Sequence, residues 1–159
     1  MTDYSYVLIL AAGIGFVAGL RSLTAPAAVS WAAHLGWLDL QGSPLAFMGS
    51  TAAVAIFSIL ALAELVADKL PTTPNRTTPG PLMARIVMGG LAGACLSVSA
   101  GRLLVAGIVL GGIGGVIGAF VGYEVRRRLA HGPKLKDVII AILEDLIAIG
   151  LALLIVSWR

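Results

Sequence analysis

The sequence predicts an all-α integral membrane bundle of about six spans, in which the second span either crosses the bilayer or is re-entrant. The chain has 159 residues, of which 58% are hydrophobic and only 12% are charged. Soluble domains carry about 25% charged residues. Apolar runs of roughly 20 residues, the length that crosses ~30 Å of hydrocarbon, follow one another along the chain. Polar residues gather in short intervals between these runs. We therefore expect a single membrane domain over residues 1–159.

Three apolar runs make up the first half of the chain, residues 1–69. Residues 4–20 form a glycine-rich run that ends at Arg21. Residues 24–40 form an alanine-rich run that is short for a span and would also suit a re-entrant half-helix. Residues 47–67 form a full span that carries Glu64 near its end, four residues before Asp68 and therefore on the same helix face.

A proline-rich hinge, residues 70–82, leads to the second half, residues 83–159. This half has apolar runs at 83–100, 103–123 and 138–158. The middle run is a glycine zipper, because its glycines recur every four residues: Gly107, Gly111, Gly115 and Gly114, Gly118, Gly122. Such a face presses closely against another helix. It predicts a homo-oligomer, a dimer or larger, unless the monomer itself uses the glycines.

The basic residues predict the topology. Lys69, Arg76 and Arg85 lie in or beside the hinge, and Arg126, Arg127, Arg128, Lys134 and Lys136 lie before the last span. Lysine and arginine near span ends mark the cytoplasmic side. Two spans separate the basic intervals, so both fall on one face. We expect a multi-pass protein of the inner (plasma) membrane with residues 69–82 and 125–137 in the cytoplasm. The N-terminus is outside with six spans and inside if the second run is re-entrant.

The two halves resemble each other weakly. Residues 18–25 are echoed by residues 92–100 with one gap, and each half ends in an acid-bearing helix. Three spans per half would make the second copy inverted, an architecture common in transporters. Short matches between glycine- and alanine-rich segments also arise by chance, so the inverted 3+3 repeat remains one of two readings.

Seven residues are candidates for a substrate or ion pathway: Arg21, Ser22, Thr24, Glu64, Asp68, Glu144 and Asp145. A charge at hydrocarbon depth costs about 2.5–3.5 kcal/mol on insertion scales, so such groups face a cavity or a partner. The acids would bind a proton or cation, or would pair structurally with Arg21, Lys69 or Arg85. Glu144 and Asp145 are adjacent, so their side chains point about 100° apart on a helix and at most one should face the pathway directly.

Five basic residues are candidates for contact with lipid head groups: Lys69, Arg76, Arg126, Arg127 and Arg128. Basic clusters beside spans attract anionic lipids. The alternative for Arg76 is a solvated loop stiffened by proline. Arg21 could bind an anionic group, pair with an acid or reach phosphate, and Ser22 and Thr24 could cap the next helix instead of lining a site.

Other site chemistries find little support in the sequence. His34, His131 and Cys95 lack ligand spacing, so we expect no metal site and no cofactor. No nucleophile motif indicates a catalytic residue. Nucleic-acid binding would need a solvent-facing basic domain, which the chain has no room to form.

These observations favour a small transporter or channel for a small ion or solute, coupled to protons or cations through intramembrane acids. One alternative is a protein that handles or modifies lipids at the cytoplasmic head-group layer. Another is a structural partner subunit without chemistry of its own. The lipid bilayer is the expected environment in each case.

Two motifs carry a family resemblance: Gly19-Leu-Arg21-Ser-Leu-Thr-Ala-Pro26 and Glu64-Leu-Val-Ala-Asp68-Lys69-Leu-Pro71 through Arg76-Thr77. With them the chain resembles a bacterial membrane-protein family catalogued as domain of unknown function 4126. The similarity covers most of the chain, including the last acidic span. It implies a polytopic membrane protein and brings no established activity.

Overall fold

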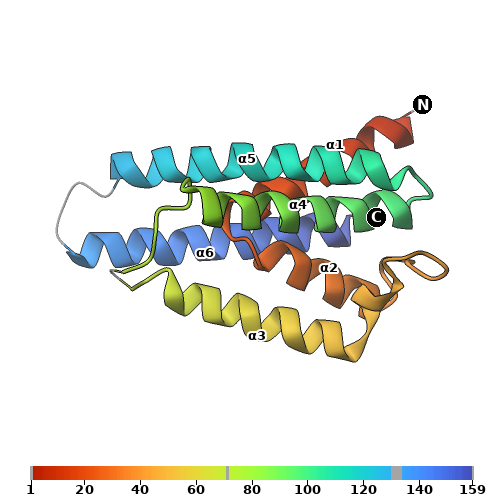
Figure 1. The fold of residues 1–159 in the computed structure, drawn as a ribbon, viewed down its shortest axis with the longest axis horizontal. Coiled ribbons are helices and arrows are strands. Elements are labelled where there is room, and N and C mark those ends of the chain that lie inside the picture. Colours follow the sequence, from red (N-terminus) through yellow and green to blue (C-terminus); the bar gives the residue numbers. More distant parts are fainter. Residues whose placement is uncertain (1, 71, 130–133, 159) are drawn as a thin grey trace.

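The computed structural model describes residues 2–70, 72–129 and 134–158 (Figure 1). In these ranges the chain is helical and has no strand. The helices are α1 (Thr2–Leu20), α2 (Thr24–His34), the short 3₁₀ helix η1 (Ala46–Gly49), α3 (Thr51–Ala67), α4 (Pro79–Ser99), α5 (Leu104–Leu129) and α6 (Lys134–Ser157).

Three helices in the described ranges are long and apolar enough to cross a membrane: α4, α5 and the part of α6 from Asp137 to Ser157. The apolar stretch Tyr4–Leu20 of α1 and the whole of α3 are shorter. At 1.5 Å per residue, α2 with its 11 residues is about 16 Å long, half the thickness of the hydrocarbon layer. The all-helical fold is confirmed in the described residues, and three of the helices could span a membrane, whereas the count of six spans stays a prediction.

Helix boundaries differ from the apolar runs where turns intervene. The second run reaches residue 40, but α2 ends at His34, and Gly36 and Gly42 adopt positive φ in the loop that follows. Conversely, α4 starts inside the expected hinge, because Pro79 suits the first helical position and Thr78 precedes it as an extended N-cap. Pro71 and residues 130–133, which belong to the expected hinge and basic loop, lie outside the described residues.

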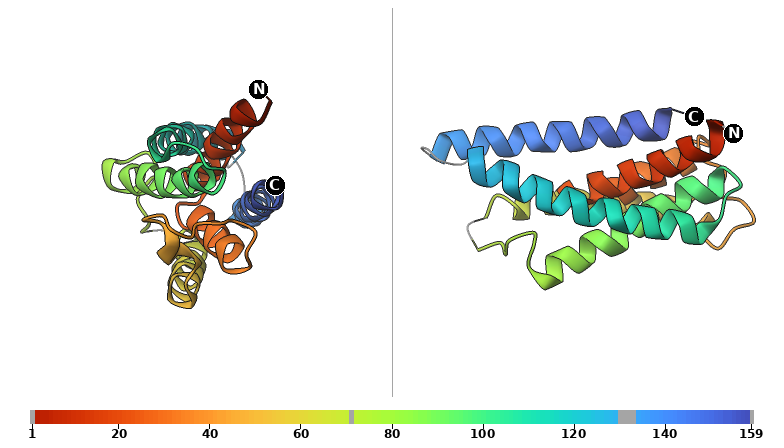
Figure 2. Two further views of the ribbon diagram at one scale, coloured as in Figure 1. Left: turned by 90° about the vertical axis from the view of Figure 1, so that its right-hand side faces the viewer. Right: turned by 90° about the horizontal axis from the view of Figure 1, so that it is seen from above.

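A tightly packed trio of helices forms the centre of the bundle, with α5 lying against both α1 and α4 (Figure 2). Glycines allow this approach. A methyl group at Gly111 would overlap the backbone of Gly89 on α4, and one at Gly118 would overlap the backbone of Phe16 on α1. The zipper glycines of α5 thus pack against helices of the same chain.

The hairpin of α2 and α3 and the last helix surround this trio. Helix α6 runs along α1 and α2 and meets α5 only slightly. Small and branched apolar side chains, among them Ile14, Val17, Val29, Cys95 and Val156, fill the space between these helices. The periphery is therefore held by side chains, in contrast to the backbone contacts of the central trio.

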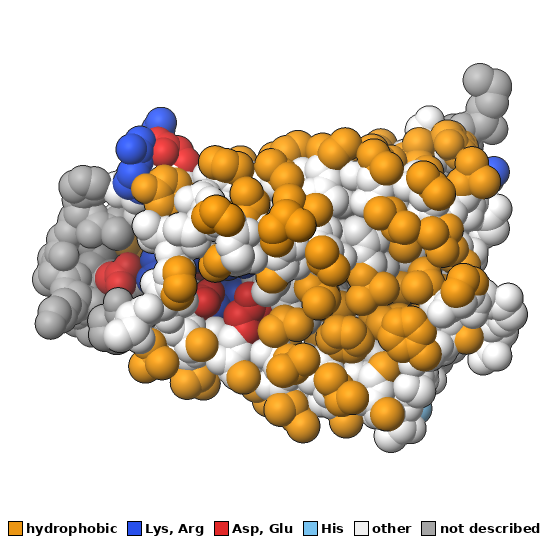
Figure 3. Space-filling view, in the orientation of Figure 1, with side chains coloured by type: hydrophobic (Ala, Val, Ile, Leu, Met, Phe, Trp, Pro, Cys, Tyr) orange, Lys and Arg blue, Asp and Glu red, His pale blue; other side chains and the backbone are white. Residues whose placement is uncertain are grey.

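The helices alternate in direction, so that α3 and α5 end, and α4 and α6 begin, at one end of the bundle (Figure 1). We call this the charged end, because acidic and basic side chains gather there and show red and blue in a hollow of the surface (Figure 3). Exposed apolar side chains cover most of the rest of this face. Leu62 on α3, Ile113 on α5 and Leu146 on α6 are among the large apolar side chains exposed on the molecule, which suits contact with lipid tails.

Candidate functional site

Arg21 lies at the break between α1 and α2 and is completely buried. Its Nη1 lies 2.6 Å from Oδ2 of Asp68, and its Nη2 pairs with Oδ1 of Asp145. Asp68 is the C-cap of α3, and Asp145 lies within α6. A lone guanidinium is costly in an apolar interior, so two carboxylates from separate helices make the position tolerable. Arg21 thereby ties three parts of the bundle together.

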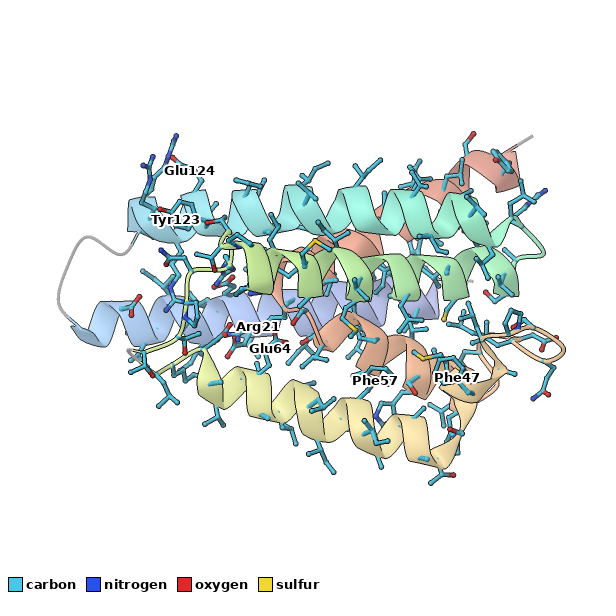
Figure 4. All side chains as sticks on the ribbon, in the orientation of Figure 1. Arg21, Phe47, Phe57, Glu64, Tyr123 and Glu124 are labelled. Carbon is cyan, nitrogen blue, oxygen red and sulfur yellow. The ribbon has the colours of Figure 1, made fainter. Side chains whose placement is uncertain are left out.

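Glu64 holds the same break from the other side, and Figure 4 shows it beside Arg21. Its Oε1 accepts hydrogen bonds from the N–H of Ser22 at 2.8 Å and from the hydroxyl of Ser22 at 2.6 Å. Its Oε2 accepts from the N–H of Leu23 at 2.9 Å. Leu23 is the N-cap of α2 and makes no side-chain capping hydrogen bond. Glu64 of α3 therefore caps α2 from a neighbouring helix.

Arg76 brings the segment between α3 and α4 into the interior. It is only 7% exposed, and its Nη1 and Nη2 contact the two carboxylate oxygens of Glu144, the second at 3.2 Å. Nη1 also lies 3.5 Å from the carbonyl oxygen of Leu20. A guanidinium that engages both oxygens is fixed in orientation. The solvated-loop interpretation is therefore wrong for Arg76, although the neighbouring Thr72 and Thr73 are exposed.

The adjacent acids of α6 serve different bases. Glu144 pairs with Arg76, whereas Asp145 pairs with Arg21 and lies 3.1 Å from Nζ of Lys69. Both acids are therefore part of the site. The sequence predicts at most one, because adjacent side chains on a helix point in different directions. Asp145 lies eight residues beyond Asp137, where the apolar part of α6 begins, or about 12 Å along the axis.

Arg85 of α4 completes what we call the ion-pair cluster, with Nη1 at 3.9 Å from Oε1 of Glu64. The cluster balances four bases against four acids: Arg21, Lys69, Arg76, Arg85, Glu64, Asp68, Glu144 and Asp145. A neutral cluster is less costly to bury than any of its members alone.

A polar cavity of about 330 Å³ opens next to the cluster at the charged end. Four arginines line it: Arg76, Arg85, Arg126 and Arg127. Asp68 is the one carboxylate among the described residues that line it, and Asn75, Thr73 and Tyr123 contribute neutral polar groups. We call this space the arginine cavity. Its excess of guanidinium groups favours an anionic occupant.

An apolar groove of about 300 Å³ lies between α1, α5 and α6. Phe16, Leu20, Val125, Leu143 and Ile147 contribute to its walls. Arg126 lines both this groove and the arginine cavity, so the two spaces adjoin. We call this second space the apolar groove.

A second polar cavity, of about 530 Å³, lies at the opposite end of the bundle. The end of α2 and the loop to α3 line it, with His34, Asp39, Gln41 and Ser50 among the lining residues. Polar hollows thus exist at both ends of the molecule, separated by the packed helices.

Most of the candidate pathway residues converge. Arg21, Ser22, Glu64, Asp68, Glu144 and Asp145 meet at the ion-pair cluster, whereas Thr24 is buried in the first turn of α2 with no part in the ion pairs that join them. Among the candidate head-group residues, Lys69 and Arg76 join the cluster, and Arg126 lines the cavity. Arg127 and Arg128 pair with Glu124, which points away from the bundle (Figure 4).

The sequence-based list of site residues omitted Arg85, Asn75 and Tyr123. Arg85 carried a signal, because it is a base within the fourth apolar run. Asn75 and Tyr123 carried none, since polar residues beside a span are common. No group of three or more metal-ligating side chains occurs in the described part of the chain.

Comparisons with known proteins identify a family. No curated protein and no solved structure matches the chain. A family described as a domain of unknown function (DUF4126) matches residues 8–158. This range includes both motifs of the sequence analysis and every member of the ion-pair cluster. The chain therefore belongs to the DUF4126 family.

Proposed function

We propose that the protein is a small membrane transporter for an anionic solute, in which the ion-pair cluster is the element that rearranges during transport. The observation that carries this proposal is Arg21, wholly buried at a helix break and shared between carboxylates of α3 and α6. Broken helices that meet near the middle of a membrane form the sites of many transporters.

The positions of the cavities support a carrier more than an open channel. The arginine cavity and the second polar cavity lie at opposite ends, and close-packed helices occupy the space between them. Passage of a solute would require one group of helices to move against another. The peripheral helices α2, α3 and α6 are joined to the rest partly through ion pairs, which can exchange partners, whereas the glycine contacts of the central trio cannot loosen without losing their packing.

The charge of the arginine cavity points to an anion. In the part of the chain that the structure describes, four guanidinium groups and a single carboxylate line it, and that carboxylate, on Asp68, is already paired with Arg21. The acids of the cluster each contact a base, so a bound cation would have to displace an arginine or lysine. A proton could still enter the cycle by neutralising one acid and releasing its basic partner.

Flux through proteoliposomes tests the proposal. The purified chain, reconstituted in neutral lipid, should carry chloride or inorganic phosphate faster than potassium. Asp145→Asn should lower anion flux by about tenfold or more. Arg21 would lose one of its two carboxylate partners, and the ion pairs that must exchange during transport would be disturbed. Arg128→Gln, which alters an exposed residue outside the cluster, should leave flux unchanged. Each variant is first shown to be monodisperse and helical.

Flux that never exceeds that of protein-free vesicles would contradict the proposal, as would a folded Asp145→Asn protein that transports like the wild type. A preference for potassium over both anions would contradict the assignment of charge.

A second candidate, a lipid-handling protein of the cytoplasmic head-group layer, is favoured by one specific observation. The apolar groove, with walls that are partly exposed on the lipid-facing surface, adjoins the arginine cavity. Lipid turnover without flux in the same vesicles would support this candidate over transport.

The inner (plasma) membrane and a cytoplasmic charged end form part of the proposal, and the basic residues of that end support both. A homo-oligomer also remains a proposal. Its interface would have to use surfaces other than the zipper glycines, because α1 and α4 already cover them. The inverted repeat is compatible with the opposite directions of α1 and α4 in Figure 1.

A further inference from the structure

We infer that the arginine cavity binds the phosphate of an acidic phospholipid, with an acyl chain of the same molecule in the apolar groove. The inference deepens the proposed function, since it rests on the same cavity as the anion site and names the class of its ligand. It concerns binding at equilibrium, which can be measured without any transport.

Arg85 supplies the first argument. It lines the cavity, it is only 5% exposed, and its Nε has no hydrogen-bond partner among the described residues. Its contact with Glu64 is 3.9 Å long, and the oxygens of Glu64 already accept three hydrogen bonds from Ser22 and Leu23. A buried donor without an acceptor is costly, so the site lacks an acceptor that a ligand oxygen would supply.

Arg126 supplies the second argument. Its contacts with protein carboxylates are long, 3.5 Å to Asp137 and 4.0 Å to Glu144. The guanidinium is therefore held near the cavity without a close ionic partner. Guanidinium groups bind phosphate oxygens in the same paired geometry that they use for carboxylates. Together, Arg85 and Arg126 would present donors to one tetrahedral anion.

The neutral residues around the cavity suit a phosphate better than a carboxylate. Tyr123 and Asn75 line the same space and carry donors that need no counter-charge. A phosphate has more oxygens than a carboxylate, so several donors from different directions can be used at once. Figure 4 shows Tyr123 at the charged end of α5.

The apolar groove indicates that this phosphate arrives on a lipid. The groove starts at Arg126, and half-exposed Val125 and Leu143 stand on opposite walls, on α5 and α6. Its volume of about 300 Å³ lies at the lower end of the range for ligand pockets. A free phosphate would leave the groove unfilled, whereas an acidic phospholipid would fill both spaces. Charge complementarity at Arg126 sets the orientation, with the head group in the cavity and the tail along α1, α5 and α6.

Native mass spectrometry of the delipidated full chain in detergent tests the inference. The probes are phosphatidic acid, phosphatidylglycerol, phosphatidylcholine and inorganic phosphate. We expect the acidic phospholipids to bind about tenfold more tightly than phosphatidylcholine, the difference that one strong charge-assisted hydrogen bond supplies. Inorganic phosphate alone should bind more weakly than either acidic lipid.

Two matched pairs of variants assign the site. Arg126→Gln should weaken binding of the acidic lipids by about tenfold, whereas Arg128→Gln, outside the cavity, should not. Leu143→Trp should fill the groove and weaken lipid binding. Leu146→Trp, which replaces another exposed leucine of α6 outside the groove, should leave lipid binding unchanged. None of these variants replaces a member of the ion-pair cluster, and the contact of Arg126 with Glu144 is a long one, at 4.0 Å. They should therefore retain the fold, which circular dichroism checks.

Several results would overturn the inference. Phosphatidylcholine also carries a phosphate, but its choline cation cancels the charge, so equal binding of this lipid would remove the selectivity for acidic phospholipids that the inference requires. Equal binding of inorganic phosphate with no effect of Leu143→Trp would remove the lipid. An equal loss in Arg126→Gln and Arg128→Gln would show surface attraction only. Lipid binding without anion flux would contradict the transport proposal and leave the lipid site in place. Anion flux without selective lipid binding would contradict the lipid site and leave the transport proposal in place.

Discussion

Glu64 shows how an acidic side chain inside a membrane-type bundle can serve the backbone. Its two oxygens accept hydrogen bonds from the N–H groups of Ser22 and Leu23, the two residues before α2, where no local side chain provides a cap. An acid at the end of an apolar run looks like an ion-binding group, because both roles require a buried negative charge. The backbone contacts favour the structural role for Glu64.

Replacing Glu64 by glutamine should destabilise the protein. The amide NH2 of glutamine would face a backbone N–H, and a buried donor left without an acceptor costs about 1–3 kcal/mol. We expect a lower apparent melting temperature in detergent, measured by intrinsic fluorescence.

Glu124→Gln is the matched control, because Glu124 pairs with Arg127 and Arg128 at the surface of α5, away from the ion-pair cluster. It should melt like the wild type. Equal melting of Glu64→Gln and the wild type would show that the cap at the α1–α2 break contributes nothing to stability.

The sequence identified the charged residues of the site but not their pairing. Arg21, Glu64, Asp68, Glu144 and Asp145 stand out because charges are rare in apolar runs. Arg21, for example, pairs with Asp68, 47 residues further along the chain, and with Asp145, 124 residues further along. No local periodicity links such distant positions, so only the packing of the helices decides which acid meets which base.

At the scale of elements, α5 is a helix whose packing depends on missing side chains. Gly111 faces the backbone of Gly89 and Gly15, whereas the adjacent Gly112 has only ordinary contact with Ile86 at 3.5 Å. The glycine pattern in the sequence predicted a close helix contact. It could not show that two partners, α1 and α4, lie within the same chain.

Gly111→Ala should therefore destabilise the bundle, because the added methyl group forces the backbones of α4 and α5 apart. Overpacking of this kind costs about 1–3 kcal/mol. Gly112→Ala, one residue away on the same helix, should be neutral or slightly stabilising, since alanine favours a helix over glycine. Thermal unfolding of both variants in the same detergent makes the comparison. Equal destabilisation would contradict the close contact of Gly111.

Helix α2 shows where the sequence misled. Apolar residues continue to residue 40, but Gly36 takes a positive φ, and the helix has already ended at His34. An apolar run indicates which residues are buried, but it does not indicate where the helix ends. Leu38 and Leu40 lie in the loop after α2 and are buried there, which accounts for their apolar character.

At the scale of the whole molecule, the arrangement of the two ends makes a testable statement about sidedness. Lys69, Arg76 and the arginines that end α5 gather at the charged end, which we propose faces the cytoplasm. Cys95 is buried, and it is the single cysteine of the chain. A Cys95→Ala background therefore permits labelling at chosen positions.

Thr77→Cys at the charged end and Gln41→Cys at the opposite end should label differently in intact cells. A membrane-impermeant maleimide should reach Gln41→Cys directly and Thr77→Cys only after the membrane is permeabilised. The reverse pattern would invert the orientation, and equal labelling in intact cells would mean that the two ends do not lie on opposite sides of the membrane.

The ion-pair cluster also constrains how the chain is made. Arg21 is synthesised early, whereas its partner Asp145 and the partner of Arg76, Glu144, come with the last helix. Until α6 enters the bilayer, Arg76 lacks the carboxylate of Glu144, and Arg21 has Asp68 but not Asp145. Assembly of the ion-pair cluster is therefore completed only when α6 inserts, because this helix brings both Glu144 and Asp145.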